Sequence, residues 1–332
     1  MSDRERTAIL LLAHGTPDAL NEIPEYLRNV TSGRPLPQAA IDEITHRYSL
    51  IGKSPLTDLA MAQARLLEQS IGSPVYVGMR NWKPYIATTV RQMRNDGITA
   101  IAAICLAPQN SRTSVGLYRR AVLAEAGHDL KVDFTEAWAD HPLLIEAFAE
   151  RLRSRYRELT AELGHRIPVL FTAHSVPCRT VQDASPPTEP QTPSVRTSPD
   201  TYAIDAKQTA RLVAAQLVND GVPEADSFFA FQSQGISGGP WIGPTVEDTL
   251  TALRQAGHTA VIIHPIGFLC DHVEVLYDID IGFREYGARI GLRVERPESL
   301  NESPTLTRAL VDLSQLALGR LAAHSAVALP IL

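Results

Sequence analysis

The feature that most constrains the fold is a faint repetition of the sequence at a constant spacing. The apolar run before His14 resembles the apolar run before His174, and the two histidines lie 160 positions apart. The same spacing relates Pro84 to Pro244, Arg94 to Arg254, and Gly97-Ile98-Thr99-Ala100 to Gly257-His258-Thr259-Ala260. Chance could supply one such match, but a constant offset over three segments indicates two copies of one αβ unit.

Each copy alternates strand-like apolar runs with amphipathic helical patterns. Residues 100–106 and 260–268 are apolar runs that follow a glycine, as expected of parallel strands covered on both faces. We therefore predict an α/β fold of two similar doubly wound, Rossmann-like domains with parallel sheets flanked by helices, related by internal duplication. We place the first domain in residues 1–150, the second in 151–310, and a C-terminal helix and tail that pack back on the body in 311–332.

Composition and charge exclude several classes of protein. The 332 residues carry a formal net charge of -6, so no basic surface for a nucleic acid is expected. The three cysteines have no CxxC spacing and are odd in number, which argues against a disulfide framework and favours a cytoplasmic protein. No apolar run reaches the length of about 18 residues expected of a membrane span.

An acidic segment follows the last long apolar run of the second copy. Read as a helix, Asp271, Glu274 and Asp278 step by three and four residues, so they share one face. Carboxylates on one face repel one another unless cations or protons relieve them, as on a metal or proton path; a solvated helix face is the alternative. Because one helix face cannot present all the polar groups of residues 271–274 inward, we expect His272 to turn to a different neighbour.

His14, His174 and the acidic segment each follow an apolar strand pattern. Ligands of parallel α/β sheets bind in the crevice beyond the carboxyl ends of the strands, so we expect these groups in a cleft between the domains. An imidazole and a carboxylate suit Fe²⁺ and also take up protons near neutral pH. His174 with Glu274 could serve either purpose, although a histidine at a strand end is often only a hydrogen-bonded structural group.

Two loops have unusual compositions. Residues 177–202 are rich in Pro, Ser and Thr, which predicts a surface loop, with a lid as the less common alternative. The glycines of residues 235–239 lack the lysine and the order of a phosphate-binding loop, so we expect a loop shaped against a ligand.

Longer motifs are spread over nearly the whole chain. They are Ala13-His14-Gly15-Thr16-Pro17-Asp18, Arg47-Tyr48 with Ile51-Gly52-Lys53-Ser54-Pro55-Leu56, Tyr76-Val77-Gly78-Met79-Arg80, Leu106-Ala107-Pro108-Gln109, Thr172-Ala173-His174-Ser175-Val176-Pro177, Phe231-Gln232-Ser233 with Pro240-Trp241, and Asp271-His272-Val273-Glu274-Val275-Leu276-Tyr277. Together these motifs resemble the ferrochelatases, lyases of haem synthesis.

The resemblance implies two chelatase-type domains that hold a porphyrin in their cleft while Fe²⁺ is inserted. His174 and Glu274 would then serve metal insertion and proton removal, with Asp271 and Asp278 as a relay. The porphyrin contacts implied are His14, Thr31, Arg47, Tyr48, Ser54 and Tyr118. Ferrous iron is a substrate in this reaction, and no cofactor is expected to be permanently bound. The C-terminal cysteines of cluster-containing relatives are missing, so no iron–sulfur cluster is expected.

The version of the family that this chain most resembles is the soluble bacterial type that acts on coproporphyrin III. Residues of about 26–56 would form a lip over the porphyrin, and this lip carries Arg28, Arg34, His46 and Arg47 instead of an apolar ridge. That composition favours a cytosolic lip and suits a porphyrin with four carboxylates, while protoporphyrin IX stays open. We expect a monomer that makes transient contact with neighbouring haem-pathway enzymes.

Three positions depart from the family pattern. His14 stands where the soluble type usually has a tyrosine facing the metal, so a nitrogen would replace a phenolate oxygen. Thr31 stands where the lip usually has an arginine. The next position of the acidic series, four residues after Asp278, is Gly282, so the outer part of the relay is shorter. An alternative function is a haem or porphyrin carrier that catalyses no reaction and uses His14 and His174 as axial ligands. A sirohydrochlorin or cobalt chelatase of the same architecture is a further alternative.

Overall fold

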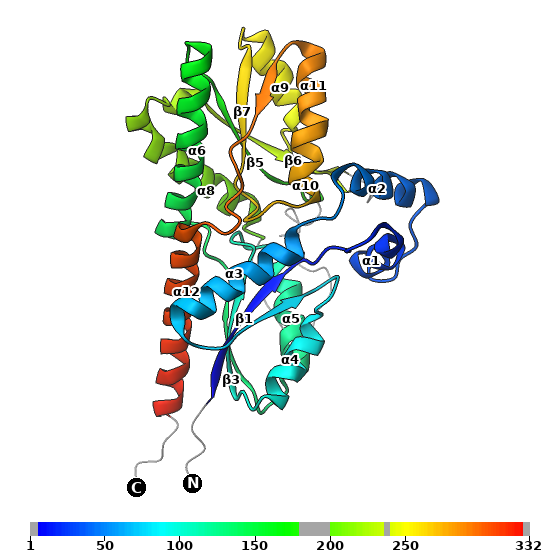
Figure 1. The fold of residues 1–332 in the computed structure, drawn as a ribbon, viewed down its shortest axis with the longest axis vertical. Helices are drawn as coiled ribbons and strands as arrows, with labels where there is room; N and C mark the ends of the chain where they lie inside the picture. Colours follow the sequence, from blue (N-terminus) through cyan, green and yellow to red (C-terminus); the bar gives the residue numbers. More distant parts are fainter. Residues whose placement is uncertain (1–5, 179–199, 236–239, 328–332) are drawn as a thin grey trace, which may run out of the picture.

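Two four-stranded parallel sheets form the framework of the protein (Figure 1). The computed structural model describes residues 6–178, 200–235 and 240–327, so most of the Pro-rich loop and the glycines at 238 and 239 lie outside the described residues. The first sheet has the order β2-β1-β3-β4, with strands Val75–Met79, Thr7–Ala13, Ala100–Cys105 and Lys131–Thr135. The second has the order β6-β5-β7-β8, with strands Ser227–Gln232, Val169–His174, Ala260–Pro265 and Arg293–Glu295.

The two halves match at the spacing read from the sequence. The sheet orders are identical when strands are paired in chain order, and β3 and β7 begin and end 160 positions apart. Helices α4 (Ile86–Asn95) and α9 (Val246–Gln255) show the same offset at both ends. Equivalent backbone hydrogen bonds run from Met79 N–H to Pro84 O and from Phe231 N–H to Pro244 O. The predicted α/β fold of two similar domains is therefore confirmed.

Both faces of the first sheet are buried, as the continuous apolar runs predicted. Side chains alternate along β1, so Ile9 and Leu11 enter one core cluster while Leu10 and Leu12 enter another on the opposite face. Each fully buried aliphatic side chain of this kind contributes about 1.5–3 kcal/mol. The remaining helices and short turns that cover the sheets are α3 (Leu56–Ile71), α5 (Val115–Ala126), α6 (Pro142–Leu163), α8 (Tyr202–Leu217), α11 (Arg284–Ile290) and the 3₁₀ turns Leu20–Glu22, Val218–Asp220 and Glu224–Asp226.

The last helix, α12 (Pro304–Val327), packs back on the first half of the chain. It runs beside β3, β4, α3 and α6, and the Arg320 guanidinium pairs with Asp133 of β4 at 2.7 Å (Figure 1). The assignment of residues 311–332 as a separate C-terminal helix and tail stays a prediction. The domain boundaries at residues 150 and 310 stay a prediction.

The predicted lip consists of α1 (Ile23–Val30) and α2 (Gln38–Ile51), which extend to one side where the two sheets meet (Figure 1). A small core of its own holds it, formed by Ile23, Tyr26, Leu27, Tyr48 and Trp82. Helix α2 also touches α10 (Val273–Leu276) of the second half, so the lip contacts both domains.

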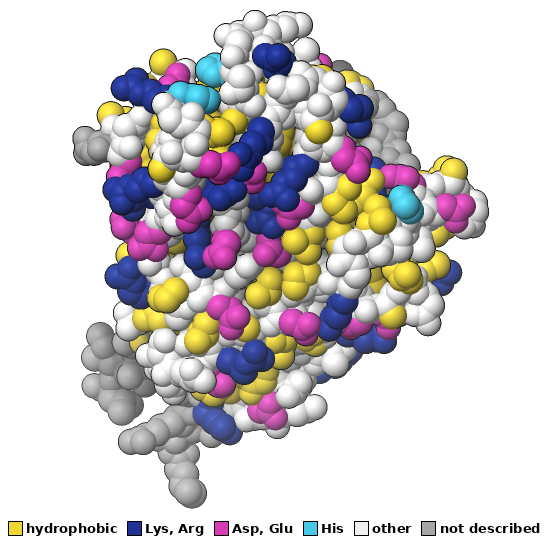
Figure 2. Space-filling view, turned by 45° about the horizontal axis from the view of Figure 1, so that its top comes forward, with side chains coloured by type: hydrophobic (Ala, Val, Ile, Leu, Met, Phe, Trp, Pro, Cys, Tyr) yellow, Lys and Arg dark blue, Asp and Glu magenta, His cyan; other side chains and the backbone are white. Residues whose placement is uncertain are grey.

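The surface carries both signs of charge. On the face in Figure 2, basic and acidic side chains lie interspersed, in keeping with the modest net charge of -6. Within the described part of the chain, no helix has the length and apolar character needed to cross a membrane.

Candidate functional site

Both predicted histidines lie at the carboxyl ends of the equivalent strands β1 and β5. His174 is the last residue of β5, and His14 directly follows β1. Gly15 then turns the chain with a φ of 84°, and a Cβ at this position would lie 2.9 Å from the backbone nitrogen of Trp82. The glycine is therefore required for the close approach that fixes the direction of His14.

His14 is a neutral imidazole held by polar neighbours. Its Nε2 lies 3.2 Å from the Tyr26 hydroxyl and 3.0 Å from the side-chain nitrogen of Asn81. Burial lowers the pKa of His14 to about 4, against the attraction of Glu274, which favours the charged form. An unprotonated nitrogen is consequently present at pH 7, and a neutral imidazole is a metal ligand.

Glu274 lies in the first turn of the short helix α10 (Val273–Leu276). Burial alone would raise its pKa, but the nearby imidazoles of His272, His174 and His14 more than offset this, and the pKa lies below its usual range. Electrostatic influence of this kind requires proximity. His272, His174 and His14 therefore lie near enough to Glu274 to influence its carboxylate.

His272 and Glu274 lie within hydrogen-bonding distance of each other. His272 Nδ1 lies 2.9 Å from the Cys270 carbonyl oxygen, which only accepts, so Nδ1 must donate. His272 Nε2 lies 3.1 Å from Glu274 Oε2, and this contact needs a second proton on one of the two atoms. The expectation that His272 turns to a different neighbour is wrong, because its backbone is extended, with a φ of -165°, and its ring returns to Glu274.

Asp271 lies outside the helix that carries Glu274. Helix α10 begins at Val273, so the prediction that Asp271 shares a helical face with Glu274 and Asp278 is wrong. The Asp271 carboxylate instead accepts hydrogen bonds from Ser299, Asn301 and Arg296, all in the segment after β8. Its part in a relay stays a prediction.

Asp278 opens a π-helix, Asp278–Phe283, in which Gly282 N–H donates to Tyr277 O at 2.9 Å. The Ser233 hydroxyl donates to the Asp278 carboxylate, and Arg47 Nη1 of the lip lies 3.4 Å from Oδ1. Burial raises the pKa of Asp278 to about 7, although Ser233 and Arg47 oppose the shift. Asp278 can therefore exchange a proton near neutral pH.

The other predicted porphyrin contacts belong to the first half. Tyr48 and Ser54 are buried; the Tyr48 hydroxyl interacts with Tyr26, whereas the Ser54 hydroxyl has no hydrogen-bond partner among the described residues. Tyr118 is buried on α5, whereas Thr31 ends α1 and donates to the Arg34 carbonyl at 2.7 Å. An unpaired buried hydroxyl group is costly and points to a ligand or an ordered water at Ser54.

Several polar neighbours were not predicted as site residues. Asn81, Tyr26 and Ser233 each bind a predicted site residue through a hydrogen bond. Ser233 and Asn81 lie in or beside motifs already noted, at the ends of strands adjacent to β5 and β1, and that position was the available signal. Tyr26 carried no signal, because it approaches His14 from the separate helix α1.

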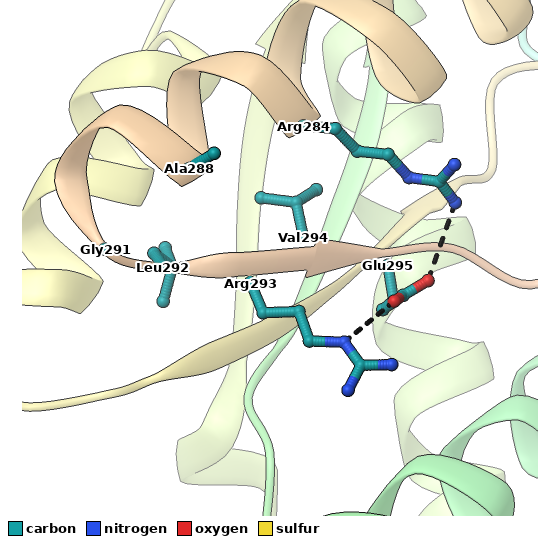
Figure 3. Close-up of a pocket in the computed structure, with 7 residues that line it drawn as sticks. All are labelled: Arg284, Ala288, Gly291, Leu292, Arg293, Val294 and Glu295. Carbon is teal, nitrogen blue, oxygen red and sulfur yellow. Dashed lines mark hydrogen bonds and ion pairs between the residues drawn. The ribbon is translucent and has the colours of Figure 1, made fainter.

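Two pockets within the described chain lie away from His174 and Glu274. The larger, of about 530 Å³, lies between α11 and β8, where Glu295 contacts Arg284 and Arg293 (Figure 3). A smaller one of about 220 Å³ borders the lip at Tyr48 and Lys53. Among the described residues, no group of three or more His, Cys, Asp or Glu is arranged to hold a metal ion. The His174 and Glu274 pair is thus no closed protein cage for a metal.

The family model for ferrochelatase matches residues 6–318. The chain belongs to the ferrochelatase family. It is 61% identical to a ferrochelatase of Acidobacterium capsulatum over 323 residues, covering 97% of this chain and 98% of the relative. It is 33% identical to a coproporphyrin III ferrochelatase of Mycolicibacterium vanbaalenii, covering 94% of this chain and 90% of that protein. The reaction of this family is the insertion of Fe²⁺ into a porphyrin, so the ferrochelatase described here is a lyase with iron as a substrate.

Solved chelatase structures share the fold. SirB from Bacillus subtilis with Fe³⁺ superposes with a TM-score of 0.54 at 12% identity, covering 94% of this chain and 95% of that chain. A second structure gives a TM-score of 0.53 at the same identity and the same coverage of both chains. It is the sirohydrochlorin chelatase SirB from Bacillus subtilis subspecies spizizenii in complex with cobalt. Likeness at this level of identity concerns the fold alone, and it agrees with the predicted chelatase-type domains.

Proposed function

We propose that this ferrochelatase inserts Fe²⁺ into coproporphyrin III, with His174 and Glu274 at the reacting centre. The observation that carries the proposal is the position of His174 and His14 at the carboxyl ends of the equivalent strands β5 and β1, both near enough to Glu274 to lower the pKa of its carboxyl group. A carboxylate and two imidazoles directed at one region provide metal ligands and proton acceptors for a macrocycle bound there.

Two observations favour coproporphyrin III over protoporphyrin IX. The lip carries cationic side chains, and Arg28 and Arg34 are exposed, where they can attract additional propionate groups. A relative that is 33% identical is named a coproporphyrin III ferrochelatase. Arg47 is engaged with Glu43 and Asp278, so it contributes to the lip as a paired group.

Metal insertion replaces two pyrrole protons by one Fe²⁺ ion. We propose that the porphyrin is bent on binding, so that pyrrole lone pairs are exposed to the incoming ion. His174 then accepts one pyrrole proton, and the second enters the acceptor group formed by Glu274 and His272. Asp278 lies four residues after Glu274 and exchanges that proton with the outside, since its pKa of about 7 permits both states.

His14 directly follows β1 of the first half, at a position equivalent to that of His174 in the second. We propose that it approaches the metal from the macrocycle face opposite His174, as a neutral nitrogen ligand, because its pKa of about 4 leaves it unprotonated at pH 7. Two axial imidazoles would also suit a haem carrier. Turnover separates the two functions.

The test is an anaerobic steady-state assay with Fe²⁺ and either coproporphyrin III or protoporphyrin IX. Multiple turnovers with a higher kcat/KM for coproporphyrin III support the proposal. Higher kcat/KM for protoporphyrin IX contradicts the substrate assignment, and one retained equivalent of haem per protein indicates a carrier.

Zinc offers a second test of the donor set. Nitrogen and oxygen ligands bind Zn²⁺ at least as well as Fe²⁺, so the proposed site inserts Zn²⁺ in vitro. Fluorescence of the zinc porphyrin measures this directly. A flat zinc assay beside active iron insertion contradicts the proposed ligands.

A further inference from the structure

The segment that carries Glu274 is fastened at both ends by one arginine. Arg296, directly after β8, binds Asp280 in bidentate fashion, through Nε at 2.8 Å and Nη2 at 2.7 Å. The same Nη2 lies 3.2 Å from Asp271. Asp271 precedes Glu274 by three residues, and Asp280 lies within the π-helix, two residues after Asp278. One guanidinium therefore joins the start of the segment to its π-helical part.

The environment makes this contact strong. Only 10% of the Arg296 side chain is exposed, and each of the two carboxylate side chains is 21% exposed. Buried bidentate pairs between arginine and carboxylate are geometrically specific, and they fix direction as well as distance. The third donor group, Nη1, binds the Pro297 carbonyl at 3.1 Å, so the guanidinium has no freedom to rotate away.

The segment needs such a fastening. A π-helix has poorer backbone geometry than an α-helix and occurs mostly as short, locally supported turns. Helix α10 before it has only four residues, Val273–Leu276, and cannot hold itself. Without Arg296, Asp280 would keep only its longer contact with Arg284, at 3.6 Å, and no guanidinium would join Asp280 to Asp271, so the start of the segment and its π-helical part would separate.

We propose that Arg296 is a positioning residue that sets where the Glu274 carboxylate lies relative to His174. The inference rests on the catalytic role proposed above for Glu274. Arg296 does not touch the substrate, so its loss displaces Glu274 without removing a porphyrin contact. Misplacement of a reacting group by about 1 Å lowers the rate of a chemical step by up to about 100-fold.

The test is the Arg296→Ala variant, assayed anaerobically with Fe²⁺ and coproporphyrin III. We expect kcat to fall by about 10- to 100-fold while KM for the porphyrin changes by less than about twofold. Guanidinium chloride at concentrations too low to unfold the protein should restore part of kcat, because the free ion can occupy the place of the side chain. Arg296→Lys should retain an intermediate kcat, since an ammonium group keeps the charge without the fork.

Arg293→Ala is the matched control. Arg293 lies on β8, three positions earlier, and pairs with Glu295 (Figure 3). It also pairs with Glu162, and both glutamates are outside the segment. This variant should keep kcat within about twofold of the wild type, as expected for a partly exposed ion pair. A comparable loss of kcat in Arg293→Ala and Arg296→Ala would overturn the proposal.

A second variant covers the case in which Arg296→Ala does not fold. Asp280→Asn keeps the shape of the side chain and weakens only the π-helical end, so kcat should fall by a smaller factor and guanidinium should not restore it.

Wild-type kcat in either variant overturns the proposal, as does a loss of kcat in Arg296→Ala that guanidinium does not reverse. If Glu274→Gln also kept wild-type turnover, the proposed role of Glu274 would be wrong; an inactive Glu274→Gln beside a fully active Arg296→Ala rejects the positioning role alone.

Discussion

The segments that follow the matching strands β3 and β7 differ in chemistry although their scaffolds match. Residues 106–118 after β3 contain no acidic side chain, whereas residues 266–283 after β7 carry Asp271, Glu274, Asp278 and Asp280. The first segment carries a single charge, Arg112, and leads into the regular helix α5 with buried Tyr118, while the second leads into a four-residue helix and a π-helix. Duplication thus preserved the sheets. Under the proposed function, the first copy contributes the porphyrin contacts and the His14 ligand, while the second contributes His174, Glu274 and the other proton acceptors.

The largest expected effect is the loss of kcat when a proposed reacting group of the second half is replaced. Glu274→Gln should lower kcat by about 100- to 10,000-fold, because an amide cannot take up a proton or bind a metal as a carboxylate does. Porphyrin binding, followed by quenching of protein fluorescence, should persist, since the proposed porphyrin contacts lie in the first half. His174→Ala should behave alike. Loss of porphyrin binding in either variant would contradict the division between the halves.

The titration of Asp278 gives the next largest effect. The pKa of Asp278 is raised to about 7, so the folded protein keeps a proton that the unfolded chain loses above a pH of about 4. Wild-type stability is therefore lost as pH rises through 7, and Asp278→Asn escapes this loss. We expect the variant to gain about 2–3 kcal/mol relative to the wild type between pH 5 and pH 8. Urea unfolding at the two pH values measures the gain, and an unchanged difference contradicts it.

A buried histidine distinguishes the two cores. His264 on β7 occupies the position of Ile104 on β3, packs against Phe148 and Phe171, and has a pKa lowered by burial to about 3. The unfolded chain takes up a proton below a pH of about 6.5 that the folded chain refuses, so stability falls as the solution is acidified.

Replacing this histidine by the residue of the first copy tests the difference. His264→Ile should reduce the stability lost between pH 7.5 and pH 5 by about 2 kcal/mol. Urea unfolding of both proteins at the two pH values provides the measurement. An equal loss in both would show that other groups cause the acid sensitivity.

The smallest expected effect concerns the first half. His14→Tyr replaces a neutral nitrogen by a phenol, so kcat should change by less than about 10-fold while the axial ligand of the bound product changes. The absorption and electron paramagnetic resonance spectra of the haem complex report that ligand. Spectra identical to those of the wild type would show that His14 does not face the metal.

The sequence was sufficient to predict the scaffold. Continuous apolar runs indicate strands that are buried on both faces, and the constant 160-residue offset indicates two copies of one αβ unit. It was also sufficient to place His14 and His174 at strand ends. It failed where backbone geometry departs from regular helix: the extended residue His272 and the π-helix after Tyr277 change which side chains meet.

Contacts between distant segments were equally out of reach. Arg296 lies 16 positions from Asp280 and 25 from Asp271, and nothing in local periodicity links it to them. Tyr26 likewise reaches His14 from the lip, where the helix pattern gives no direction relative to the sheet.

The most direct test is a crystal structure of the ferrochelatase with coproporphyrin III bound. We expect the macrocycle between the lip and α10, with His174 and Glu274 on one face and His14 on the other. A macrocycle bound elsewhere, or one with Glu274 turned away from its pyrrole nitrogens, would contradict the account.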